Sequence, residues 1–242
     1  MVITHYVLNA KIRNQITIAV VADLHGTDPT NVIKAIEAER LDIITIVGDL
    51  VDKRQTNFIE TYHFLDRCSS ISSTFMSLGN HEFILSEKNI AQITEKGVHV
   101  LDNTWIHLEN GLAIGGLTSA YVLKYRRYRD EKRIVMSDLQ WLSDFEKLPD
   151  YKILLDHHPE NYGLYTRNMS IDLILSGHNH GGQIRLFGRG LYAANQGIFP
   201  RYSGGLYDDR LVVSRGLANT KRIPRINNPT ELVFVTLNPK VT

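Results

Sequence analysis

The stretch IDLILSGHNHGGQ, residues 171–183, joins an apolar run to a polar cluster flanked by glycines. The apolar run has the length and the aliphatic side chains of a buried β-strand. The two histidines that follow it are two residues apart. They could share one metal ion, bind two ions or bind none, and the rest of the sequence must decide.

The same pattern occurs at four other places along the chain. Each time, an apolar run is followed directly by ionisable or amide side chains. Segments with helical spacing separate the runs in the front half, and the back half is rich in strands that we expect to be more antiparallel. This order predicts an α/β protein with one or two central sheets covered by helices. The five polar stretches are Asp23-Leu24-His25, Gly48-Asp49, Gly79-Asn80-His81-Glu82, Asp156-His157-His158-Pro159 and Gly177-His178-Asn179-His180.

Two helices can be predicted in more detail. Ser86 is expected to cap a helix that runs to Gly97, because serine side chains accept hydrogen bonds from the first turn. Residues 137–148 are expected to form a second helix, which Pro149 ends.

The composition is that of a single globular domain. The chain has 242 residues, 43% hydrophobic and 22% charged, with a net charge of +1. One domain over residues 1–242 fits this length, and the small net charge excludes whole-molecule attraction to nucleic acid or membrane. Cys68 is the only cysteine, which excludes an intramolecular disulfide and a thiolate metal site.

The apolar runs are too short for a membrane protein. None approaches the ~20 residues that span a bilayer, and the first residues lack the apolar core of a secretion signal. We therefore expect a cytoplasmic protein.

The polar strand ends predict a metal site. In open α/β sheets, binding sites form beyond the carboxyl ends of the strands. The side chains found there are carboxylates, imidazoles and an amide, a set that suits Mn²⁺, Fe or Zn²⁺. Asp23 and His25 would face the same side of an extended backbone, so that one ion could bind both.

The number of candidate ligands favours two ions. A catalytic zinc ion takes about three ligands from the protein, whereas two ions that share a bridging aspartate would use the whole set. Such pairs clamp the attacking and leaving oxygens of a phosphoryl transfer. The candidate ligands are Asp23, His25, Asp49, Asn80, His157, His178 and His180.

The motifs D-x-H, G-D, G-N-H-E, H-x-P and G-H-x-H, in this order, resemble the calcineurin-like metallophosphoesterase superfamily. The stretches GHNHGGQIRLFGRGLY, NQGIFPRYSGGLY, VSRGLAN and NNPTELVFVTL are similar to its bacterial YkuE- and YaeI-like phosphodiesterases, over roughly residues 15–238. The resemblance implies a four-layer αββα sandwich. Two mixed β-sheets would pack face to face between helices, with the metal site at the carboxyl edge of the strands.

The resemblance also divides the ligands between two ions. One set is expected on each ion, and Asp49 is expected to bridge the two. The first set is Asp23, His25 and His180, and the second is Asn80, His157 and His178.

Three further residues are implied to act on the substrate. His81 would lie near the leaving-group oxygen and help proton or charge transfer. His158 would face the substrate or support a ligand, and Arg215 is a candidate for binding the substrate phosphate, although it could equally be an ordinary surface arginine. Asp52 and Asp156 are expected to orient neighbouring ligands, and Glu82 is expected to be structural.

We therefore expect a binuclear metal-dependent phosphoesterase that hydrolyses a phosphodiester or pyrophosphate bond. Two Mn, Fe or Zn ions per chain would lower the pKa of a bound water, and metal-bound hydroxide would attack phosphorus in line. A phosphomonoesterase and a catalytically silent interaction scaffold of the same fold are the alternatives. The presence of every expected ligand argues against the scaffold. The expected partner is a phosphorylated small molecule or a lipid-linked phosphate, not nucleic acid.

Residues 119–133, SAYVLKYRRYRDEKR, form a basic and aromatic segment. Tyr121, Tyr125 and Tyr128 would share one face if the segment were helical. The segment is either a solvated loop or a flap near the metals that engages a phosphate or an anionic lipid surface.

Overall fold

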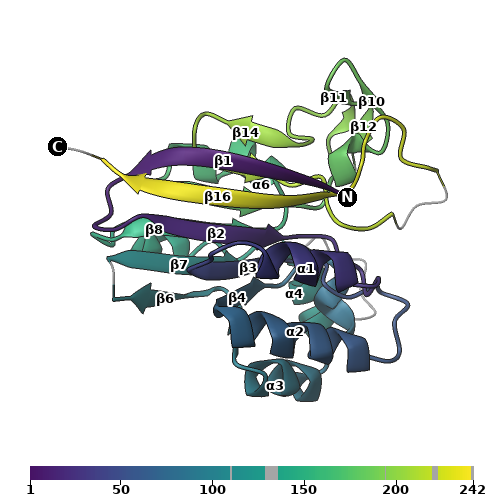
Figure 1. The fold of residues 1–242 in the computed structure, drawn as a ribbon, viewed down its shortest axis with the longest axis horizontal. Helices are drawn as coiled ribbons and strands as arrows, with labels where there is room; N and C mark the ends of the chain where they lie inside the picture. Colours follow the sequence, from purple (N-terminus) through teal and green to yellow (C-terminus); the bar gives the residue numbers. More distant parts are fainter. Residues whose placement is uncertain (110, 129–135, 194, 220–222, 241–242) are drawn as a thin grey trace.

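Two six-stranded mixed sheets pack face to face in the computed structural model, and helices cover their outer faces (Figure 1). The structure describes residues 1–109, 111–128, 136–193, 195–219 and 223–240. The first sheet has the order β1 (Val2–Ala10), β16 (Glu231–Pro239), β2 (Ile16–Val21), β3 (Ile43–Val47), β4 (Ser73–Ser77), β5 (Val98–Leu101).

The second sheet lies against the first. Its order is β14 (Gly205–Tyr207), β15 (Leu211–Val213), β9 (Leu173–Ser176), β8 (Tyr151–Asp156), β7 (Leu112–Leu117), β6 (Thr104–Leu108). Two small hairpins stand apart from both sheets: β10 (Arg185–Leu186) with β11 (Arg189–Gly190), and β12 (Tyr192–Ala193) with β13 (Gly197–Ile198).

The alternation of side chains along each strand builds the layers. In β2, Ile18 and Val20 belong to the core between the sheets, whereas Ala19 and Val21 face the outer helices. Each fully buried aliphatic side chain contributes roughly 1.5–3 kcal/mol to folding. Because strands buried on both faces need apolar residues at every position, they appear in the sequence as continuous apolar runs.

Helices complete the two outer layers. The first sheet is covered by α1 (Thr30–Glu37), α2 (Ile59–Ile71) and α3 (Glu87–Glu95), and the second by α5 (Leu142–Phe145) and α6 (Glu160–Leu164). Buried Ile36, Phe64 and Ile93 join the first three helices to their sheet, and Phe145 and Tyr162 join the last two to theirs. The predicted four-layer αββα sandwich is confirmed.

Ser86 caps α3 as predicted, but the helix predicted over residues 137–148 is much shorter. Ser86 Oγ accepts a hydrogen bond from Asn89 N, and the Asn89 side chain accepts one from Ser86 N. Only Leu142–Phe145 is helical in the second case. Leu139 is joined to Leu142 by a turn, so the apolar spacing reflects consecutive turns rather than one helix.

The back half contains more antiparallel pairs than the front half, as expected, in the two hairpins, in β14 with β15 and in β16 with β2. The centre of the second sheet is nevertheless parallel, because β7, β8, β9 and β15 are parallel neighbours and, within this sheet, the outer strands β6 and β14 run antiparallel to their partners. Helices α5 and α6 lie between successive strands and return the chain to the same edge of the sheet. The carboxyl ends of β8 and β9 therefore lie at one edge, as those of β2, β3 and β4 do.

Part of the basic segment is a helix, α4 (Ala120–Tyr128). Val122 and Leu123 are buried, and Phe83 packs against the rings of Tyr121 and Tyr125. The first part of the predicted flap is thus anchored beside the 3-10 turn η1 (His81–Ile84). Residues 129–133 lie outside the described residues. Within the described ranges, no helix is long and apolar enough to cross a bilayer.

Candidate metal centre

The seven predicted ligands follow five strands that end at the same edge. Two of these strands belong to the second sheet and three to the first. The ligands are Asp23 and His25 after β2, Asp49 after β3, Asn80 after β4, His157 after β8, and His178 and His180 after β9.

A first group of ligands consists of Asp23, His25 and His180. The Nε2 atoms of His25 and His180 are 3.3 Å apart, and Asp23 Oδ1 lies 3.8 Å and 3.6 Å from them, respectively. All three residues are buried. Their ligand atoms lie within 4.8 Å of one another, so the three side chains can surround one cation.

A second group consists of Asp49, His157 and His178, whose ligand atoms also lie within 4.8 Å of one another. Asp49 Oδ2 is 3.2 Å from His157 Nε2 and 3.8 Å from His25 Nε2, so it lies between the two groups. Asn80 lines the same cavity as Asp49 and His178. By the same distance, His25, Asp49 and His81 form a further group, and so do His158, Glu160 and His178. The assignment of each ligand to one of two ions therefore stays a prediction.

Buried atoms without partners indicate that the second group fits a cation. His178 Nε2 and Asn80 Oδ1 are buried and form no hydrogen bond, whereas buried polar atoms are normally paired. His157 Nδ1 lies 2.8 Å from the carbonyl oxygen of Val47. Because a carbonyl only accepts, Nδ1 donates, and Nε2 is left to face Asp49. Carbonyl partners of this kind orient metal-binding histidines.

The protonation of the histidines depends on what lies beside each ring. Burial lowers the pKa of His25 to about 4 and lowers that of His178 well below its usual value, so both offer lone pairs at neutral pH. Burial would also lower the pKa of His157, but Asp49 raises it to about 10. In the absence of a metal ion, a proton on His157 therefore offsets the Asp49 charge.

Arg225 is the group that fits least well with a cation in the first group. Its Nη2 lies 3.2 Å from His180 Nδ1, and a guanidinium can only donate. With Nδ1 accepting, a neutral His180 ring carries its proton on Nε2, the atom that faces Asp23. Metal binding at this atom would require the proton to leave or Arg225 to move.

Five of the seven ligands have a left-handed backbone. The φ angles of Asp23, His25, Asp49, His178 and His180 are 54°, 51°, 50°, 68° and 45°. Each such residue costs roughly 1–3 kcal/mol, and this strain concentrates at functional sites. The expectation that Asp23 and His25 share a face of extended backbone is wrong, because neither is extended. They meet because the chain turns sharply after β2.

Hydrogen bonds hold this strained backbone in place. His25 N donates to Asp49 O at 3.0 Å, and His178 N donates to Asp23 Oδ2 at 3.0 Å. Glu82 accepts hydrogen bonds from the backbone N–H groups of Asp49 and Leu50, both at 2.8 Å. Burial, with help from Asp49, raises the pKa of Glu82 to about 7. Its position agrees with the structural role expected of it.

Gly48 and Gly79 allow the two sheets' ligands to approach each other. A Cβ atom on Gly48 would lie 2.6 Å from Gly79 Cα and 2.7 Å from the His157 ring, and one on Gly79 would lie 2.5 Å from Asp49 Oδ1. Gly48 also has a φ of 72°. Any side chain at either position would push Asp49 and His157 apart.

His81 lies beside the bridging position but outside the two ligand groups of the resemblance. Its backbone N–H donates to Asp49 Oδ1 at 2.7 Å, and its Nδ1 accepts from Lys53 N at 3.0 Å. Burial lowers the pKa of its ring. The ring is therefore neutral with its proton on Nε2, which lies 3.9 Å from Asp49 Oδ2. Asp52 Oδ2 lies 3.8 Å from Nδ1 of His81 and 4.0 Å from that of His25.

A cavity of about 540 Å³ opens onto the ligands. It is lined by Asp49, Asn80, His81, His178 and His180. Lys53, Arg54, Gln183, Tyr192 and Ile223 also contribute to its wall.

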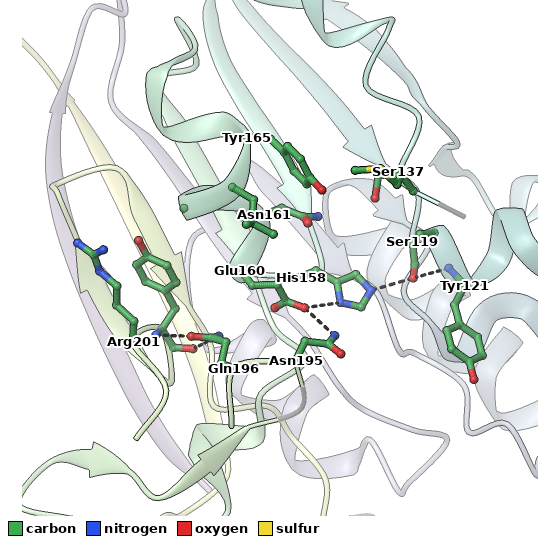
Figure 2. A pocket seen from close by; sticks show the side chains of 15 residues that line it. Ser119, Tyr121, Ser137, His158, Glu160, Asn161, Tyr165, Asn195, Gln196 and Arg201 are labelled. Atoms are coloured by element: carbon green, nitrogen blue, oxygen red, sulfur yellow. Dashed lines mark hydrogen bonds and ion pairs between the residues drawn. The ribbon is translucent and has the colours of Figure 1, made fainter. Parts of the chain in front are cut away.

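His158 lines a second cavity, of about 510 Å³ (Figure 2). Its ring lies 4.3 Å from that of His178, centroid to centroid, so the two cavities adjoin. His158 Nε2 is 2.8 Å from Ser119 Oγ and its Nδ1 is 3.4 Å from Glu160 Oε1. Both ring nitrogens thus have partners, and a direct hydrogen bond to substrate would need one of them to move. Asp156 Oδ1 accepts from His158 N at 3.1 Å and helps to orient this turn.

The side chain of Arg215 is paired with Glu231. Its Nη2 donates to Glu231 Oε1 at 2.9 Å and its backbone N–H to Glu231 Oε2 at 3.0 Å. It lines neither of the cavities described above. The Arg215 side chain is therefore held by Glu231, and its role in binding the substrate phosphate stays a prediction.

Several residues of the site were not predicted from the sequence. Asn228 Nδ2 donates to the carbonyl oxygens of His180 and Gln183 at 2.7 and 3.2 Å and so holds the turn after β9. Ser119 and Glu160 hold His158, and Arg225 contacts His180. The stretch NNPT contains Asn228 and was the one available signal, but nothing in it indicates the contact with His180.

Comparisons with known proteins identify the family. Residues 16–182 match the model of the calcineurin-like phosphoesterase family. An uncharacterised metallophosphoesterase of Aquifex aeolicus is 28% identical over 84% of this chain and 76% of its own length. One from Campylobacter jejuni is 29% identical over 90% of this chain, which spans only 56% of that relative. The sulfate thiohydrolase SoxB of Thermus thermophilus shares the fold, with a TM-score of 0.51 and 15% identity over 69% of this chain and 48% of its own. The chain belongs to the calcineurin-like phosphoesterase family.

Proposed function

We propose that this protein is a binuclear metal-dependent phosphodiesterase that hydrolyses a phosphodiester or pyrophosphate bond. The observation that carries the proposal is the division of the ligands into two groups that meet at Asp49. A single ion in the first group would leave the buried His178 Nε2 and Asn80 Oδ1 of the second group without a partner.

The residues present fit two Mn, Fe or Zn ions. Asp23, His25 and His180 would hold one, Asn80, His157 and His178 the other, and Asp49 both. Bound ions of this kind lower the pKa of water and offset charge on phosphoryl oxygens.

His81 would stabilise the leaving-group oxygen as a neutral hydrogen-bond donor. Lys53 N donates to its Nδ1, so the ring proton is on Nε2. An imidazolium would have to give up this hydrogen bond, because its Nδ1 would also carry a proton. We therefore favour charge stabilisation by the Nε2–H over full proton transfer.

Two adjoining cavities support a diester rather than a monoester. A phosphodiester has two arms, and the ligand groups are bordered by the cavity beside His81 and by the cavity beside His158. His158 would form part of the wall for the second arm, held by Ser119 and Glu160. A monoester would use one cavity, so a phosphomonoesterase is the second candidate.

A panel of soluble substrates tests the proposal. Protein supplied with Mn²⁺ would be assayed on a bis-aryl phosphodiester, the matching aryl monoester, a cyclic nucleotide and a nucleotide-linked glycolipid. The proposal predicts hydrolysis of the diester at a higher kcat/KM than the monoester. A preference for the monoester would favour the second candidate, and no hydrolysis with two ions bound would favour the scaffold.

A further inference from the structure

The two small hairpins and the segment after them carry exposed apolar side chains. Half of the large apolar side chains that are exposed in the described part of the chain lie within residues 186–226. Phe187 is fully exposed, and Ile198 and Phe199 are 72% and 62% exposed. Exposed apolar side chains that cluster in this way mark an interaction surface, whereas scattered ones do not. We call Leu186, Phe187, Tyr192, Ile198, Phe199 and Ile223 the hairpin face.

Backbone hydrogen bonds place the parts of the hairpin face side by side. Leu191 N donates to Ile184 O at 2.7 Å, and Phe199 N donates to Leu191 O at 2.8 Å. Tyr192 and Ile198 are partners across the β12–β13 hairpin. Figure 1 shows β10, β11 and β12 grouped at one end of the molecule. The exposed side chains therefore belong to one region of the surface.

The hairpin face borders both cavities of the candidate metal centre. Tyr192 and Ile223 line the cavity that contains His81, His178 and His180. The turn of the β12–β13 hairpin supplies Asn195 and Gln196 to the cavity beside His158 (Figure 2). Whatever binds the hairpin face is thus held at the entrance to the ligands.

The charged side chains of this region are basic. The sequence has no acidic residue between Asp172 and Asp208, and none between Asp209 and Glu231. Arg189 and Arg201 are exposed within the first of these stretches. A partner that offers both an apolar layer and negative charge fits this surface, and an anionic bilayer offers both, since basic residues gain from anionic lipids while apolar side chains enter the headgroup boundary.

We propose that the hairpin face docks on an anionic phospholipid bilayer, with the cavity of the metal centre open toward lipid headgroups. The contact differs from the one considered for residues 119–133, because it is made by the hairpins. Docking is independent of the proposed hydrolysis. The corollary that a headgroup phosphodiester is the substrate rests on the proposed function.

Vesicle sedimentation tests the docking directly. The full chain would be mixed with phosphatidylcholine vesicles with and without phosphatidylglycerol, and the bound fraction measured. We expect binding to the anionic vesicles, reduced by about tenfold or more in each of Phe187→Ser and Phe199→Ser, because each removes a large apolar group from the membrane boundary. Arg189→Glu should weaken binding and its dependence on anionic lipid.

Matched controls separate docking from folding and from catalysis. Ile59→Ser and Val7→Ser remove apolar side chains that are 55% and 65% exposed elsewhere, and they should bind vesicles like the unmodified protein. Asp49→Ala should lose hydrolysis and keep vesicle binding. Phe187→Ser and Phe199→Ser should keep hydrolysis of the soluble aryl diester.

Three outcomes would overturn the docking proposal. They are no sedimentation with anionic vesicles, equal sedimentation of the hairpin and control variants, and loss of a protein dimer in Phe187→Ser without any vesicle binding. None of them bears on the metal centre, which the soluble substrate tests separately.

Discussion

The two ligand groups of the metal centre are built from similar residue types, but their ligand atoms differ in their hydrogen-bond partners and in the charges beside them. In the second group, His157 is fixed by Val47 O, and His178 Nε2 and Asn80 Oδ1 have no hydrogen-bond partner. In the first group, Nε2 of His25 and of His180 face each other at 3.3 Å, and Arg225 places a positive charge against His180. Two groups of similar ligands therefore need not bind metal ions with equal affinity. We expect the second group to bind its ion more tightly.

Removal of the residue between the groups should have the largest effect. Asp49→Ala should lower hydrolysis of an aryl phosphodiester by on the order of 10³ or more, because both ions lose a ligand. Elemental analysis of the same variant should show reduced content of both ions. Thermal unfolding is the control for folding, and an unchanged rate would remove the mechanism.

Variants that each lose one ligand, from the first or from the second group, test the two ligand groups separately. His178→Ala and His180→Ala should each retain about one ion per chain and lose activity by on the order of 10²–10³, since each leaves only one half of the centre intact. The ion retained by His180→Ala should be bound more tightly than the one retained by His178→Ala. Equal affinities in titrations of both variants would contradict the proposed difference between the groups.

Substitutions of His81 test whether its side chain acts as a hydrogen-bond donor to the substrate. His81→Ala should lower kcat by on the order of 10², the range for loss of one donor to a developing negative charge. His81→Asn keeps a donor and should recover part of this loss, with two ions still bound in both variants. If the pH profile of His81→Ala lost an acidic group that the unmodified protein shows, proton transfer would replace this role.

The second group should bind its ion with release of a proton. Asp49 raises the pKa of His157 to about 10 despite burial, so the metal-free ring is protonated below that pH and an ion must displace the proton. The affinity of the second group for its ion should therefore rise by about tenfold per pH unit as the pH increases toward 10. Titrations in buffers of several pH values measure this slope, and a flat dependence for the tighter ion would contradict it.

Arg225 should have the smallest effect, confined to the first group. Arg225→Met removes a charge next to His180 and should strengthen the binding of the weaker ion by roughly fivefold, the effect of removing a charge contact of about 1 kcal/mol, its size at the dielectric constant of water. The affinity of the tighter ion should be unaffected. A change in both affinities would indicate that Arg225 acts through the loop it holds at Ala218 and Arg215.

The sequence was most informative where one segment carries both the strand and its polar end. Runs such as ITIAVVAD and IDLILSGHNH predicted the strands and their shared edge, because burial on both faces leaves a continuous apolar run. Strand β1 was not predicted, since its partner β16 comes from the other end of the chain. The left-handed backbone at Asp23 and His25 could not be read from spacing.

The contacts around the ligands were the hardest to predict. Asn228 and Arg225 reach His180 across 48 and 45 residues, and no local pattern indicates such pairs. Arg215 fits a substrate role by its motif, yet its side chain is paired with Glu231, a contact between residues 16 positions apart. The cellular location and the role of residues 119–133 stay predictions.

We propose that the ligands form a centre for two ions. Mn²⁺ titration followed by elemental analysis of the desalted protein tests this proposal most directly, with Asp49→Ala as the control. We expect about two ions per chain in the unmodified protein, bound in two steps of unequal affinity. Saturation at one ion per chain, or no bound metal after loading, would contradict it.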